Sequence, residues 1–310
     1  MTLDRRQFIT TTGIASASMF LTSLEAFSLA NKPAFTANAN FQLQIMATNW
    51  GFKGDMDQFC EKVKKEGYDG VELWWPSDKK AQDEMFAALK KFDLSVGFLC
   101  GASQENPEEH LASYQKMIDA AARQNIQHPL YINNHSGRDH FTFEQNSQFI
   151  AHTTALSKET GIPIMHETHR SRMLFAAHIA RKFIETYPDL RLTLDISHWC
   201  NVHESLLADQ KETVAMALDR TDHIHARIGH PEGPQVNDPR APEWEPAVKQ
   251  HFVWWDKVVE RKRKSGERIT FLTEFGPADY MPTLPYTRQP LGDQWAINVH
   301  MLHLLRKRYS

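Results

Sequence analysis

The sequence predicts a single (β/α)8 barrel, because short apolar segments of β type alternate with longer helical segments eight times along the chain. The alternation extends over about 270 residues, which matches the usual size of such a barrel. An open, doubly wound sheet is the alternative, but the first predicted strand is not followed by the glycine-rich turn that holds a dinucleotide in such folds. We therefore expect one barrel domain over residues 31–310.

The eight predicted strands are short apolar runs between turn-forming residues. They cover residues 43–48, 70–74, 95–99, 130–133, 163–166, 191–196, 223–228 and 269–273. A helical pattern follows each strand; the first, over residues 55–66, opens on an acidic residue and is followed by Gly67, a common helix terminator. The last, over residues 293–308, ends in basic residues, as helix electrostatics favours. The long connection over residues 229–246 is rich in Pro and Gly, and such loops are usually functional.

The first 30 residues are predicted to be an export signal and not part of the barrel. Arg5 and Arg6 resemble a twin-arginine signal, and residues 7–24 carry no charged residue. Many Thr and Ser residues make this stretch too weakly apolar for a comfortable membrane anchor. We expect cleavage near residues 26–31, a periplasmic location and no stable membrane insertion afterwards.

Composition favours a small-molecule ligand. The formal net charge of -3 provides no overall positive field to attract nucleic acid. The three cysteines, Cys60, Cys100 and Cys200, have no CxxC spacing, so neither a disulfide framework nor a thiolate zinc site is expected. A homo-oligomer is compatible with the sequence, which does not determine the number of subunits.

Four residues of the metal-ligand type follow the last four predicted strands: Glu167, Asp195, His225 and Glu274. The carboxyl ends of barrel strands surround one mouth, so these side chains are expected to converge although they lie far apart in the sequence. Three carboxylates and one imidazole form a mostly oxygen site, which suits one Mn²⁺, Mg²⁺ or Co²⁺ ion, while Zn²⁺ also fits.

This ordered set resembles the xylose isomerase-like barrels, a superfamily that includes sugar isomerases and epimerases, inosose dehydratase and AP endonucleases of the endonuclease IV type. The resemblance covers nearly all of residues 41–310. By likeness to the ketose 3-epimerases, the same four residues are implied to hold the metal, and His198 is implied to bind a substrate hydroxyl.

Further residues are predicted to bind substrate because they lie near these strand ends. They are His169, Arg170, Arg227, His135, Glu72 and Trp74. The tryptophan can pack against a sugar ring or against the core, and the arginines can bind substrate oxygens or neutralise the acidic site. His166 and His223 are expected to face the barrel wall and pack there.

A metal beside two glutamates suits proton abstraction next to a carbonyl. In this interpretation Glu167 and Glu274 form the acid/base pair, and the substrate passes through an enediolate. With the resemblance to the sugar epimerases, this interpretation implies a divalent-metal-dependent sugar isomerase or epimerase.

Departures from the epimerases keep other reactions open. Where the family carries a further glutamate and a substrate arginine, this chain has Met173 and Pro231. The same enolising chemistry on a 3-keto glycoside would end in β-elimination, which makes a lyase one alternative. Another is an endonuclease IV-like phosphodiesterase, although Arg240 replaces an expected histidine two residues after Asp238. A sugar-binding barrel without catalysis is the third.

Overall fold

The computed structural model describes residues 38–310, and in this part of the chain eight parallel strands close into a barrel. The strands are β1 (Gln42–Thr48), β2 (Gly70–Trp74), β3 (Ser95–Gly101), β4 (Ile132–His135), β5 (Ile164–Glu167), β6 (Leu192–Leu194), β7 (Thr221–His225) and β8 (Arg268–Thr273). Each strand pairs with the next in the sequence, and β1 pairs with β8 from Gln42 opposite Arg268 to Ala47 opposite Thr273. The predicted (β/α)8 barrel is confirmed; the predicted signal over residues 1–30 lies outside the described residues.

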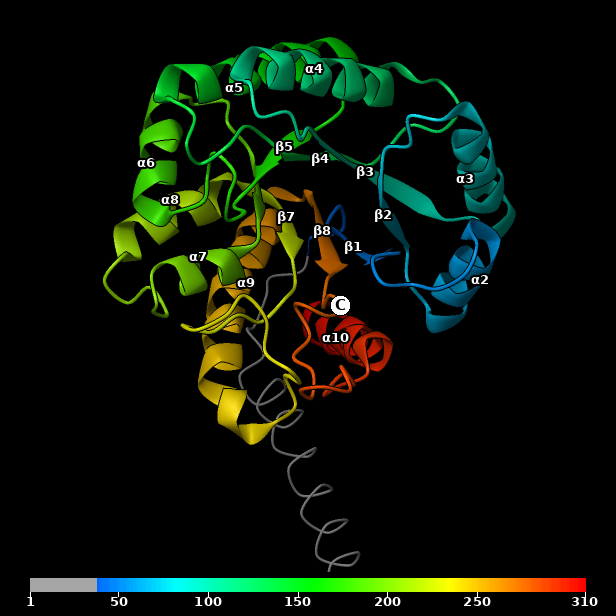
Figure 1. The fold of residues 1–310 in the computed structure, drawn as a ribbon, viewed down its shortest axis with the longest axis vertical. Helices are drawn as coiled ribbons and strands as arrows, with labels where there is room; N and C mark the ends of the chain where they lie inside the picture. Colours follow the sequence, from blue (N-terminus) through cyan, green and yellow to red (C-terminus); the bar gives the residue numbers. More distant parts are fainter. Residues whose placement is uncertain (1–37) are drawn as a thin grey trace, which may run out of the picture.

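The helices form the outer ring around the strands (Figure 1). They are α2 (Met56–Glu66), α3 (Lys79–Phe92), α4 (Pro107–Arg123), α5 (Phe143–Thr160), α6 (Ala177–Thr186), α7 (Ile196–Val202), α8 (Lys211–Arg220), η1 (Pro242–Trp244), α9 (Glu245–Ser265) and α10 (Gln294–Tyr309). Among the described residues, no helix is long and apolar enough to cross a membrane.

Local sequence explains several helix boundaries. Asp55 caps α2, because its side chain accepts the N–H of Gln58 while the Gln58 side chain accepts the N–H of Asp55. Gly67 ends the same helix in the left-handed conformation, at φ 88°. The predicted strand over residues 191–196 is shorter in the structure, because the Asp195 carboxylate accepts the N–H of Ser197 and begins helix α7.

The core lies mainly between the strands and the helices and is built from apolar side chains of both layers. A second, smaller apolar cluster consists of Met46, Tyr131, Met165 and Leu272. The ring of Tyr131 lies 4.2 Å from that of His223, so this cluster borders the buried polar residues of the barrel interior. The polar residues in turn lead toward the carboxyl ends of the strands.

Candidate metal centre and pocket

The four predicted metal ligands lie together at the carboxyl ends of β5 to β8. Glu167 ends β5, Asp195 follows β6, His225 ends β7 and Glu274 follows β8. Glu167, Asp195 and His225 are at most 2% exposed, whereas the Glu274 side chain is 13% exposed. The site is therefore shielded from solvent and opens on the side of Glu274.

His225 is the centre of this group. Its Nδ1 lies 2.9 Å from Oε2 of Glu274 and 3.6 Å from Oε1 of Glu167. Ligand atoms of Asp195, His225 and Glu274 lie within 4.8 Å of one another, and so do those of Glu167, Asp195 and His198. The barrel thus brings together residues that are separated by up to 107 positions in the chain.

Arg227 lies between two of the carboxylates. Its Nη2 donates to Oδ2 of Asp195, and its Nη1 is 3.5 Å from Oε2 of Glu274. The other oxygen of Asp195 accepts the hydroxyl of Ser197. Both oxygens of Asp195 therefore already have partners, which makes it the least available of the four candidate ligands.

Glu167 is held by two polar side chains from β4. Its Oε2 accepts from Nδ2 of Asn133 at 2.8 Å and lies 3.0 Å from Nε2 of His135. His135 is itself partly exposed toward the pocket. Glu167 therefore lies behind His135 as seen from the pocket.

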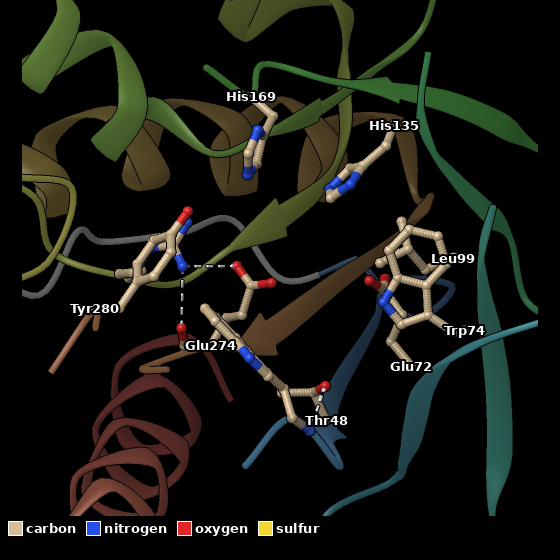
Figure 2. A pocket seen from close by; sticks show the side chains of 10 residues that line it. Thr48, Glu72, Trp74, Leu99, His135, His169, Glu274 and Tyr280 are labelled. Atoms are coloured by element: carbon tan, nitrogen blue, oxygen red, sulfur yellow. Dashed lines mark hydrogen bonds and ion pairs between the residues drawn. The ribbon is translucent and has the colours of Figure 1, made fainter. Parts of the chain in front are cut away.

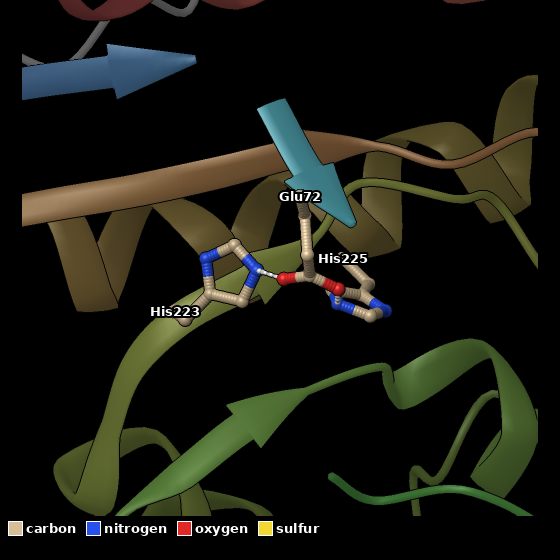
Figure 3. Close-up of side chains that lie close together, drawn as sticks. All are labelled: Glu72, His223 and His225. Atoms are coloured by element: carbon tan, nitrogen blue, oxygen red, sulfur yellow. Dashed lines mark ion pairs between the residues drawn. The ribbon is translucent and has the colours of Figure 1, made fainter. Parts of the chain in front are cut away.

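Glu72 and the two histidines of β7 form a buried cluster that shares His225 with this group (Figure 3). Oε2 of Glu72 is 3.1 Å from Nε2 of His223, and Oε1 is 3.3 Å from Nε2 of His225. The expectation that His223 packs in the barrel wall is wrong: residues 223 and 225 are two positions apart and so face the same side of the strand. His166, one position before Glu167, does point outward and contacts Thr153 of α5 at 2.8 Å.

A pocket of about 200 Å³ lies next to the cluster, with Glu72 in its lining (Figure 2). Its lining combines aromatic and ionisable side chains, namely Thr48, Trp50, Glu72, Trp74, Leu99, His135, His169, Arg227, Glu274 and Tyr280. This is smaller than the roughly 300–1,000 Å³ typical of sites for drug-sized ligands. The pocket therefore suits a small molecule.

Five of the seven predicted substrate residues line this pocket: Glu72, Trp74, His135, His169 and Arg227. The other two do not. His198 is fully buried, with its ring 4.0 Å from that of His169 and its Nε2 2.9 Å from Nη2 of Arg227. Arg170 lies against the ring of Tyr280, 5.0 Å from its centroid.

Several site residues were not predicted from the sequence: Asn133 beside the candidate ligands, and Thr48, Trp50, Leu99 and Tyr280 in the pocket lining. Asn133 contacts Glu72, Glu167 and His225 through its amide nitrogen. Asn133 lies two residues before His135 in β4, and side chains two positions apart in a strand face the same side. This alternation could have predicted that Asn133 faces the site. Tyr280 lies in the connection between β8 and α10, where no periodic pattern indicates which side chain faces the pocket.

Asp238, a residue of the phosphodiesterase alternative, is not one of the pocket-lining residues. Both of its carboxylate oxygens accept from Arg240, at 2.8 and 2.7 Å. The arginine that replaces the expected histidine thus forms a bidentate pair with the aspartate. This arrangement differs from a metal site, in which the carboxylate would face the ion.

The electrostatics of the site follow from buried charges close together. Burial raises the pKa of Asp195 to about 6, although Arg227 acts against this. Burial would also raise the pKa of Glu167, but His135 and His225 hold it well below its usual value. Burial lowers the pKa of His225, yet the carboxylates of Glu274, Glu167 and Glu72 raise it well above the usual range.

The arrangement of donor atoms fits a cation. His225 Nδ1 and Glu274 Oε2 are both buried and, within the described part of the chain, neither has a hydrogen-bond partner although they are 2.9 Å apart. Two unprotonated acceptor atoms this close together would repel each other, so the pair must share either a proton or a cation. Carboxylate and imidazole donors suit a divalent metal ion.

Comparison with known proteins agrees with the architecture. The profile of the family described as "Xylose isomerase-like TIM barrel" matches residues 60–260. No curated protein matches the sequence.

Three solved structures share the fold at low sequence identity. A D-tagatose 3-epimerase-like protein has a TM-score of 0.56 and 11% identity, with 86% of this chain and 96% of that chain covered. AP endonuclease, family 2, from Brucella melitensis has a TM-score of 0.53 and 14% identity, covering 86% and 99%. A probable 3-DHS dehydratase from Bacillus anthracis, involved in petrobactin synthesis, has a TM-score of 0.51 and 12% identity, covering 86% and 99%. At these identities the likeness shows the fold alone.

Proposed function

This chain belongs to the xylose isomerase-like TIM barrel family, and from that premise we propose that it is a divalent-metal-dependent sugar isomerase or epimerase. The proposed reaction begins with removal of a proton from the carbon next to a substrate carbonyl. The observation that carries the proposal is the position of Glu274, a carboxylate that lines the pocket and also belongs to the buried group of candidate ligands.

Glu274 is the candidate general base. It is the most exposed of the four candidate ligands, and its Oε2 lies 3.5 Å from Nη1 of Arg227, which helps to fix the position of the carboxylate. A general base must lie within hydrogen-bond reach of the proton that it removes. Of the predicted acid/base pair, Glu167 and Glu274, only Glu274 lines the pocket.

His135 can deliver a proton on another side of the substrate, with the ionised Glu167 carboxylate behind it as the acceptor that orients its imidazole. His135 lies 3.0 Å from Oε2 of Glu167 and lines the pocket, so the pair joins the buried carboxylate to the substrate. Delivery of the proton to the other face of the same carbon gives an epimer, and delivery to the neighbouring carbon gives an isomer.

Glu167, Asp195, His225 and Glu274 would hold the metal ion. When bound there, a divalent ion would polarise the substrate's carbonyl and stabilise the negative charge that develops on its oxygen. Arg227 keeps Asp195 ionised and in place, which preserves a ligand that burial would otherwise tend to neutralise.

The pocket walls support a sugar-like substrate. Trp74, 49% exposed, and Trp50, 36% exposed, present aromatic surface to the same small cavity as Tyr280. Aromatic faces pack well on the apolar faces of sugar rings, while His169 and Arg227 offer polar atoms to hydroxyl groups.

Proton exchange tests this function directly. Metal-loaded protein is incubated in D₂O with a panel of ketoses and 3-keto glycosides, and NMR follows deuterium at carbons next to the carbonyl. We expect metal-dependent incorporation that is lost after chelation, and a drop of at least about 100-fold in the Glu274→Gln variant, the usual contribution of a general base.

Two controls accompany this experiment. Metal content is measured in the variant, because Glu274 is also a candidate ligand, and the exposed Glu84→Gln variant should exchange at the wild-type rate. The product then distinguishes epimerisation or isomerisation from β-elimination. If wild-type, metal-loaded protein exchanges no proton in any substrate of the panel, enolisation is contradicted.

A further inference from the structure

We propose that Glu72 is a positioning residue for the metal centre: it accepts the Nε2 proton of His225 and thereby presents the unprotonated Nδ1 to the metal. The inference rests on the proposed metal site. It assigns Glu72 a role toward His225, in addition to its place in the pocket lining.

The geometry points to this task because Glu72 is placed between two histidines (Figure 3). It is 2% exposed, and its two oxygens lie 3.1 Å from His223 Nε2 and 3.3 Å from His225 Nε2. The other ring nitrogen of His223, Nδ1, points away from Glu72. It lies 2.7 Å from Oγ1 and 3.1 Å from the carbonyl oxygen of Thr270.

The two nitrogens of His225 have different surroundings. Nδ1 faces the carboxylates of Glu274 and Glu167, whereas Nε2 faces Glu72 and the side chain of Asn133. A neutral imidazole carries its proton on one nitrogen, and the hydrogen bond made by that nitrogen decides which one remains free for a metal. A carboxylate behind a ligating histidine is the usual means of fixing that choice.

Asn133 is a competing hydrogen-bond donor to Nε2 of His225, and Glu72 is needed to keep the proton on that nitrogen. Its Oδ1 accepts the N–H of Asn134 at 2.7 Å, so its other amide atom is the Nδ2 donor, which contacts Glu167 at 2.8 Å. The same Nδ2 lies 3.2 Å from Nε2 of His225. Without an acceptor at position 72, Nε2 would accept from Asn133, and the imidazole proton would move to Nδ1. A protonated Nδ1 would donate to Glu274 and could not bind a metal.

Substitutions at position 72 separate this tautomer control from a simple charge effect. Glu72→Leu removes the acceptor, and we expect it to weaken Mn²⁺ binding, measured by isothermal titration calorimetry, by about 10- to 100-fold. Glu72→Gln retains an acceptor oxygen without the charge. We therefore expect its Mn²⁺ affinity to stay within about threefold of that of wild type, well above that of Glu72→Leu. Circular dichroism and thermal melting confirm that each variant is folded.

His223→Gln is the matched control. It removes the other partner of Glu72 but leaves the contact with His225, so its Mn²⁺ affinity should remain close to that of wild type. A Glu72→Gln variant as weak as Glu72→Leu would show that only the charge matters and would overturn the proposal. Binding of a second ion that is lost in both the Glu72 and His223 variants would also overturn it, because the cluster would then be a metal site.

A measurement on the wild-type protein keeps the inference testable if Glu72→Leu does not fold. In zinc-loaded protein with ¹⁵N-labelled histidine, NMR should show His225 with a protonated Nε2 and a metal-bound Nδ1. The opposite assignment would contradict positioning by Glu72. If wild-type protein binds no divalent ion at all, the proposed metal site itself fails, a result distinct from equal binding by all variants.

Discussion

Tyr280 lies in the pocket as a neutral side chain that contacts two cations. The guanidinium carbons of Arg227 and Arg170 lie 4.7 and 5.0 Å from the centroid of its ring. Contacts of this kind contribute about 0.5–2 kcal/mol each when partly desolvated. The ring therefore helps to keep Arg227 in position beside Asp195.

Removal of this ring should impair substrate binding more than chemistry. For Tyr280→Leu we expect KM to rise by about tenfold, equivalent to about 1.4 kcal/mol, with kcat changed less. Tyr280→Phe keeps the ring and serves as the control. Initial rates of deuterium incorporation with the best substrate of the panel give both constants; equal KM values for the Leu and Phe variants would contradict a role for the ring.

At the scale of elements, helix α9 supports the connection that follows β7. His251, fully buried in α9, accepts the N–H of Gly229 on Nε2 at 3.2 Å, while its Nδ1 lies 2.8 Å from the carbonyl oxygen of Ala247. Gly229 has no room for a side chain, because a Cβ there would lie 2.6 to 2.8 Å from atoms of Ser197. These contacts fix the chain just beyond Arg227.

His251 should contribute to the pH dependence of stability. Burial lowers its pKa to about 4, although the hydrogen bond to Ala247 acts against this. In the unfolded chain the histidine has a pKa near 6.5, so it takes up a proton at a higher pH than in the folded protein. The contribution of His251 to the free energy of unfolding is therefore fully present above about pH 6.5 and is lost as the pH falls toward 4. The full effect is at most about 3 kcal/mol.

The comparison with His251→Gln isolates this residue from the other buried histidines. Free energies of unfolding, measured with urea between pH 4.5 and 8, should fall less steeply with decreasing pH in the variant than in wild type. Parallel curves for the two proteins would show that His251 does not titrate in this window.

At the scale of the whole molecule, the barrel encloses a site whose four candidate metal ligands lie at the carboxyl ends of four different strands. Such a site exists only in the folded chain, because the ligands of the unfolded chain are far apart. Export of an already folded protein would allow metal to be inserted before transport. We propose that Arg5 and Arg6 direct this route to the periplasm.

Replacement of both arginines by lysine tests the proposed route. In a bacterium with a twin-arginine transporter, we expect the double variant to remain in the cytoplasm while the wild-type precursor is processed and exported. Cell fractionation and immunoblotting measure the distribution, with Lys32→Arg as a control outside the paired motif. Export of the double variant at the wild-type level would contradict the proposal.

The sequence alone determined the barrel and the order of its candidate ligands. Alternation of strand and helix patterns is a local property, and the carboxyl end of each strand is a defined place in such a barrel. Glu167, Asp195, His225 and Glu274 could therefore be placed at one mouth before any distance was known, and the structure brings them together.

Tertiary structure alone decided the partners of these residues. Strand register decides that Asn133 contacts three site residues and that Arg227 pairs with both Asp195 and Glu274. The path of the loop after β8 decides that Tyr280 enters the pocket. These are contacts between residues distant in the chain, whose geometry no local pattern encodes. Glu72 illustrates the difference: its strand was predictable, but its position between His223 and His225 arises only when β2 and β7 face each other across the closed barrel.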